Sequence, residues 1–154
     1  MASLDWCKNQ KDGIQLAEPS ENIAEDYLKN AEESLRVLKM VMENGSRIWT
    51  ATMKYYIEYF CVSAVLSRIG IKSGIHDCTI EATEFLEKHG VFKDNLSTRL
   101  KRSKELRIDN QYNLKNRPVD VDTQDLMDLI LKMKDIKDKL TEKRVNELRS
   151  RLFS

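Results

Sequence analysis

The residues best able to do chemistry lie in and just before the stretch KELRIDNQYNL, residues 104–114. At 100° per residue, one stripe of a helix through this region would collect leucines and polar side chains together. Its members, in or beside the stripe, are Leu96, Leu100, Ser103, Arg107, Asn110, Gln111 and Leu114. An arginine among core-facing leucines needs a carboxylate, a phosphate or several carbonyl oxygens to satisfy it. Two interpretations stay open: Arg107 forms an internal ion pair, for example with Glu58, or it binds an anion at a cleft between subunits.

The same stretch lies in the densest basic run of the chain, where five cations oppose a single Glu105. These cations are Arg99, Lys101, Arg102, Lys104 and Arg107. Just beyond them, Tyr112 offers a ring on which a base could stack. The alternative for most of this run is a plain solvated surface, which is where most charge runs lie. The residues that we predict to contact RNA or a nucleotide are Arg99, Arg102, Lys104, Arg107, Asn110 and Tyr112.

Other kinds of chemical site find little support in the sequence. His76, Asp77 and Cys78 are consecutive, so on a helix they point about 100° apart and cannot share one ion. His89 is too far along for a paired zinc spacing, and no C-x-x-C or H-x-x-x-H occurs. No nucleophile elbow and no phosphate-binding glycine loop is present either. We therefore predict no metal and no cofactor, and we expect His76 to begin or cap a helix.

Charge and hydropathy bear on where the protein acts. The net charge of +1 gives no global attraction to nucleic acid or to a membrane, so any such binding requires a local patch. The most apolar window is interrupted by Lys54, Glu58 and Arg68, which argues against a membrane span. The N-terminus has no apolar core of a signal peptide. We expect a cytoplasmic protein without membrane contact.

The three cysteines support the same location. Cys7, Cys61 and Cys78 form an odd set without a C-x-x-C pair, which favours a reducing compartment. Cys61 lies in the apolar run YFCVSAVL and is most simply a small buried side chain.

The elements that must position these residues are helices. Only five glycines and two prolines occur in 154 residues, and apolar residues recur at three- and four-residue steps. We predict an all-α, up-and-down bundle of five to six helices over residues 20–154, preceded by an N-terminal arm over residues 1–19. The first expected helix begins near Ser20 and ends before Gly45, and the second covers residues 46–69. After a turn at residues 70–77, a third helix ends at residue 89 and a fourth covers residues 94–112. One or two final helices are capped near Asp122 and Thr141.

The second of these helices is apolar around nearly its whole circumference, so either its own bundle or a partner subunit must surround it. Lys54 and Glu58 are spaced to pair on it at i,i+4. We expect a homodimer, because this helix carries more apolar surface than one bundle covers from one side.

Over residues 18–140 the sequence resembles the HEPN superfamily (higher eukaryotes and prokaryotes nucleotide-binding), and most of all its small stand-alone prokaryotic members. The resemblance is carried by AEESL in the first helix, by the tyrosine-rich second helix leading to a Gly-Ile-x-Ser-x-x-His turn, and by a late Leu-Arg pair ending at Arg107. It implies a dimeric helical bundle that binds RNA or a nucleotide, often paired with a minimal nucleotidyltransferase as toxin and antitoxin.

Catalytic members of this family are metal-independent endoribonucleases with an arginine and, after four to six residues, a histidine. Arg107 matches the arginine, but the corresponding positions hold Tyr112, Asn113 and Leu114. Tyrosine, with a pKa near 10, is a poor general base at pH 7, so we expect binding without efficient cleavage. Arg107 and Tyr112 are nevertheless the candidate catalytic pair. One alternative is an active endoribonuclease in which Arg107, Asn110 and Tyr112 suffice, with or without His76 supplied from elsewhere in the fold. The other is a non-catalytic adaptor for a nucleotidyltransferase.

Overall fold

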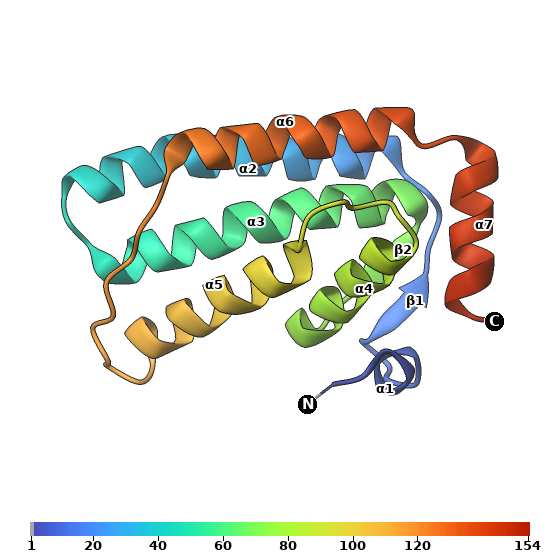
Figure 1. Cartoon of the computed structure of the whole chain (residues 1–154), viewed down its shortest axis with the longest axis horizontal. Coiled ribbons are helices and arrows are strands. Elements are labelled where there is room, and N and C mark those ends of the chain that lie inside the picture. The colour runs from blue at the N-terminus through green and yellow to red at the C-terminus, as the bar shows by residue number, and fades with distance from the viewer. Residues whose placement is uncertain (1) are drawn as a thin grey trace.

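The computed structural model describes residues 2–154, which form seven helices and one small sheet (Figure 1). The elements are α1 (Leu4–Lys8), β1 (Ile14–Leu16), α2 (Glu21–Glu43), α3 (Arg47–Ile69), β2 (Ile71–Ser73), α4 (His76–Lys88), α5 (Leu96–Gln111), α6 (Thr123–Lys139) and α7 (Glu142–Leu152). The predicted helical fold class is broadly confirmed, but the predicted number of five to six helices is wrong. The added helix is α1, whose five residues are too few to show a helical period in the sequence.

The sheet corrects the interpretation of residues 70–77 as a simple turn. Three of these residues form β2, which pairs antiparallel with β1, so that Ile14 lies opposite Ser73 and Leu16 opposite Ile71. Ile14 and Ile71 are both buried. Strands of three residues are too short for alternation to be visible in a sequence, which is why this sheet was missed.

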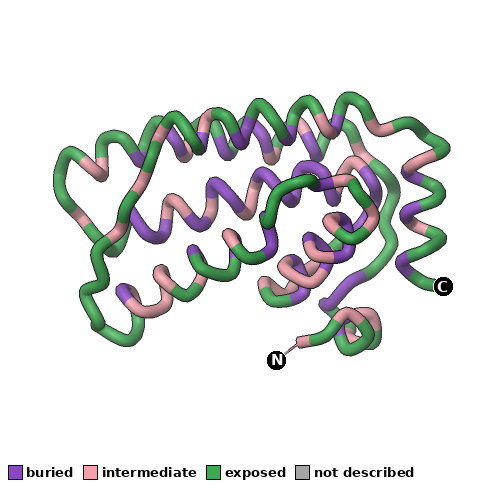
Figure 2. Tube along the Cα trace, viewed as in Figure 1, coloured by how far each residue is buried: buried purple, intermediate pink, exposed green. Residues whose placement is uncertain are grey.

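Helix α3 is the central element (Figure 1). It runs beside α2, and α5 and α6 pack along it as well, with α4, α7 and β2 near its C-terminal end. The purple of buried residues follows α3 along most of its length in Figure 2. The bundle itself therefore covers most of the apolar circumference that the sequence had left open to either its own helices or a partner.

Helix boundaries follow the capping signals in the sequence. The Ser20 hydroxyl accepts a hydrogen bond from the Ile23 backbone N–H, and Thr141 does the same for Arg144. Gly70, at φ +84°, ends α3, and a Cβ there would lie 2.5 Å from the backbone oxygen of Ala17. A glycine at this position lets the chain turn from α3 into β2 beside the N-terminal arm.

The predicted stripe on α5 holds only in part. Leu96, Leu100, Ser103 and Asn110 are buried, but the helix ends at Gln111, and Leu114 is 77% exposed. Leu114 has a positive φ, which lies outside helical geometry. Its inclusion in the stripe was therefore wrong.

Two of the three cysteines are paired, contrary to the interpretation of an odd, reduced set. Cys7 of α1 and Cys78 of α4 form a disulfide, whereas Cys61 is free and buried as expected. Among the helices of residues 2–154, none combines the length and the apolar character needed to cross a bilayer.

Candidate functional site

Arg107 lies on aromatic rings rather than against a carboxylate. Its guanidinium carbon is 5.0 Å from the ring centre of Tyr55 and 5.6 Å from that of Tyr56, both on α3. Within residues 2–154, no acidic side chain forms an ion pair with it. Stacking on aromatic faces holds the guanidinium plane while its hydrogen-bond donors remain available.

The donors of Arg107 differ in their surroundings. Its Nε is buried and has no hydrogen-bond partner among the described residues. Its terminal nitrogens also have no hydrogen-bond partner among the described residues, but they are not buried and reach the surface. Nearby on α5, two buried amide oxygens, Asn110 Oδ1 and Gln111 Oε1, are unpaired as well. Buried polar atoms are normally satisfied, so this group is incomplete without water or a ligand.

His76 lies at the first position of α4 and joins the same aromatic group. Its Nδ1 is 2.5 Å from the hydroxyl oxygen of Tyr55, and its ring stacks on Tyr59 at 4.8 Å between ring centres. Burial lowers the pKa of His76 below its usual 6.5, and the positive charges of Arg107 and Lys104 lower it further. The imidazole is therefore mostly neutral at pH 7.

Tyr55 connects the histidine and the arginine. It is fully buried, and this burial raises the pKa of its hydroxyl well above the usual value of 10. The hydroxyl stays protonated at neutral pH and can donate or accept a hydrogen bond. We define the Arg107 site as Tyr55, Tyr56, Tyr59, His76 and Arg107. Its residues come from α3, α4 and α5.

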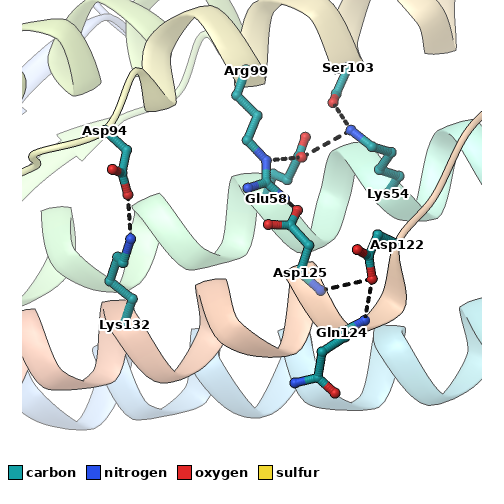
Figure 3. Close-up of polar contacts among 9 residues, drawn as sticks. All are labelled: Lys54, Glu58, Asp94, Arg99, Ser103, Asp122, Gln124, Asp125 and Lys132. Carbon is teal, nitrogen blue, oxygen red and sulfur yellow. Dashed lines mark hydrogen bonds and ion pairs between the residues drawn. The ribbon is translucent and has the colours of Figure 1, made fainter.

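Arg99, predicted to contact RNA, lies in a network of ion pairs (Figure 3). It donates at 2.6 Å to both Glu58 and Asp125. Glu58 also accepts from Lys54 at 3.1 Å, which confirms the predicted i,i+4 pair. Both cations contact one oxygen of Glu58, Oε2, and Arg107 forms no ion pair with this carboxylate among the described residues, so the proposed internal ion pair between Glu58 and Arg107 is wrong.

The other predicted contact residues are dispersed. Lys104 pairs with Asp77, next to His76. Arg102 is exposed, but it lies about 140° around α5 from Arg107. Asn110 is one turn from Arg107 and donates to the Leu106 backbone oxygen at 3.0 Å. Tyr112 follows the end of α5 and is 66% exposed, and within residues 2–154 its ring contacts none of the aromatic rings under Arg107.

One group of carboxylates within residues 2–154 has the spacing of a metal site. Oxygens of Glu21, Glu25 and Asp138 lie within 4.8 Å of one another. The ammonium of Lys137 is paired with all three, at 2.7 Å to both Glu25 and Asp138. A cation thus already balances these charges, and we assign the group a structural role.

Sequence reasoning weighed His76 as an alternative but missed Tyr55 and Tyr59 as its partners. The available signal was the run YYIEY, residues 55–59, in which positions 55 and 59 share one helical face. That signal indicates only a shared face, and the approach of α4 to it depends on tertiary structure.

Comparison with known families decides what kind of protein this is. The model of the HEPN domain matches residues 24–144, which is most of the chain. The chain belongs to the HEPN family. The HEPN match includes the whole Arg107 site and leaves out the N-terminal arm. HEPN domains are associated with nucleotide and RNA binding and with ribonuclease activity, and they often act as dimers. No curated protein and no solved structure matches the chain significantly.

Proposed function

We propose that this HEPN domain binds RNA or a nucleotide, with Arg107 holding a phosphate. One observation carries the proposal: the Arg107 guanidinium stacks on Tyr55 and Tyr56 and has no carboxylate partner among residues 2–154. Elsewhere on α5, Arg99 and Lys104 are neutralised by Glu58 and Asp77. A preorganised guanidinium with free terminal nitrogens suits bidentate binding of a phosphate.

We also propose that the protein works as a homodimer, with the Arg107 site at or near the interface. Four half-buried aromatic side chains form a continuous strip across α2 and α3, with ring centres 5.9–6.1 Å apart along it. This aromatic strip consists of Tyr27, Tyr56, Tyr59 and Phe60. It adjoins Arg107 through Tyr56. A second copy packed on the strip would bring two Arg107 sites into one cleft.

The exposed Tyr112 has a place in this proposal. Its ring can stack on a base of a single strand whose phosphate lies at Arg107.

The resemblance to small prokaryotic members supports a nucleotidyltransferase partner in a toxin–antitoxin-like pair. When the protein is co-expressed with a minimal nucleotidyltransferase, the two should elute together as a complex on gel filtration.

Fluorescence anisotropy with a labelled single-stranded RNA tests the binding proposal. Affinity should fall as salt rises, by about 0.7 in log K per log salt for each phosphate contacted. Unlabelled RNA and unlabelled mononucleotide, added as competitors, separate the two ligand classes. An anisotropy that stays flat at low salt, with no displacement by either competitor, would overturn the proposal.

A further inference from the structure

We propose that His76 is the proton-transfer residue of an RNA-cleaving site, in place of the histidine that the family motif sets after Arg107. The inference rests on the proposed binding of RNA at Arg107. It concerns a histidine from a different helix, at the start of α4, outside the motif on α5.

Both side chains are arranged around one buried ring. His76 contacts Tyr55 through its Nδ1, and Arg107 lies over the face of the same tyrosine. Tyr56 is also shared, with its ring centre 6.1 Å from that of His76 and 5.6 Å from the Arg107 guanidinium carbon. A phosphate held by Arg107 would therefore lie beside the imidazole.

The second ring nitrogen of His76 is free to exchange a proton. Nε2 has no hydrogen-bond partner in residues 2–154. Because this nitrogen is not buried, a ligand can reach it. The Tyr55 hydroxyl accepts from Nδ1–H in the tautomer whose Nε2 carries the lone pair. Tyr55 is thus a positioning residue, which holds the imidazole ring in place without contacting the substrate.

The proposed step is an internal transesterification of RNA. His76 Nε2 takes the proton of a ribose 2′-hydroxyl, and O2′ forms a bond to the adjacent phosphorus. The P–O5′ bond breaks, and the leaving O5′ receives a proton from the imidazolium or from water. The products are a 2′,3′-cyclic phosphate and a 5′-hydroxyl end, and Arg107 balances the charge that develops on the phosphoryl oxygens.

The charged groups around His76 favour the neutral imidazole that this step needs. Arg107 and Lys104 on α5 lower its pKa, while Asp77 on α4 opposes them, and burial is the largest cause of the lowering. The groups on α3 that face it are the rings of Tyr55, Tyr56 and Tyr59. Since the active form is deprotonated, the cleavage rate should rise with pH through a midpoint below 6.5 and then stay level.

Cleavage of labelled single-stranded RNA in EDTA tests the inference, with binding measured on the same samples. His76→Asn keeps a polar group beside Tyr55 but loses the proton acceptor, so cleavage should fall about 10²- to 10⁴-fold with RNA affinity unchanged. His89→Gln is the matched control, because His89 lies at the other end of α4, where its side chain contacts the backbone oxygen and the ring of Phe85. It should cleave as the wild type does.

Tyr55→Phe and Tyr59→Phe separate positioning from packing. Both rings stack on His76, but only the Tyr55 hydroxyl contacts Nδ1. Tyr55→Phe should slow cleavage about tenfold with unchanged RNA affinity, and Tyr59→Phe should reduce the cleavage rate by a smaller factor. The inference is overturned if the wild-type protein binds RNA without cutting it, or if wild type and His76→Asn cut RNA at the same rate. Either result leaves the proposed function standing. Wild type that binds no RNA overturns both.

Discussion

A single buried carboxylate, Glu58, joins three helices through side chains. It is 2% exposed, and its Oε2 accepts from Arg99, which also pairs with Asp125 on α6, and from Lys54 of its own helix (Figure 3). Its Oε1 has no hydrogen-bond partner among the described residues. Glu58→Gln leaves Arg99 and Lys54 without their shared anion. The free energy of unfolding should fall by about 2–4 kcal/mol, measured by urea denaturation.

Asp94→Asn is the matched control for that substitution. The Asp94–Lys132 pair is also an ion pair on the same side of the bundle, but both side chains are about half exposed. Its loss should cost less than about 1 kcal/mol. Equal effects of the two substitutions would contradict the structural role assigned to Glu58.

For single residues, the sequence predicts ion pairs within one helix but not the ion pairs between helices, which depend on tertiary structure. The Lys54–Glu58 pair follows from i,i+4 spacing alone. The partners of Arg99 could not be predicted, because they come from α3 and α6 and no spacing encodes their approach. Arg107 was recognised from its place among leucines, but the aromatic rings beneath it depend on how α5 crosses α3.

At the scale of elements, the disulfide fixes the N-terminal arm to the bundle. Cys7 of α1 is bonded to Cys78, two residues after His76 in α4. Cys7→Ala should lower the free energy of unfolding by about 2–4 kcal/mol under non-reducing conditions, since the closed loop no longer restricts the unfolded chain. Reducing agent should remove the difference between variant and wild type.

Thiol titration checks the premise of that prediction. Denatured, unreduced protein should present only Cys61, and full reduction should release Cys7 and Cys78 as well. Three reactive thiols before reduction would contradict the pairing.

The six longer helices were predicted from apolar periodicity and caps, whereas α1 and the sheet were not. A helix of five residues and strands of three carry too few positions for a period to emerge. Their stability comes from contacts distant in sequence, such as Arg149 donating to the backbone oxygens of Ala17 and Gly70. Local patterns do not report such contacts.

For the whole molecule, we expect a dimer of about 36 kDa, twice the 18.0 kDa chain mass, in sedimentation equilibrium at micromolar concentration. Because the bundle covers most of α3, we assign the contact with a partner to the half-buried aromatic strip. Phe60→Glu places a charge in the strip and should shift the protein to monomer. Leu131→Glu, on the exposed side of α6, is the control and should leave the dimer intact. A wild-type monomer would contradict the shared cleft.

The central claim is that Arg107 holds a phosphate, and one comparison of affinities tests it most directly. The whole chain has a net charge of only +1, so binding should depend on this local group rather than on global attraction. Single-stranded RNA affinity is measured for wild type, Arg107→Ala and Arg36→Ala, where Arg36 is an exposed arginine on α2. We predict at least a tenfold loss and a salt slope smaller by about 0.7 for Arg107→Ala, with little change for Arg36→Ala. Equal affinities for the two variants would contradict the account.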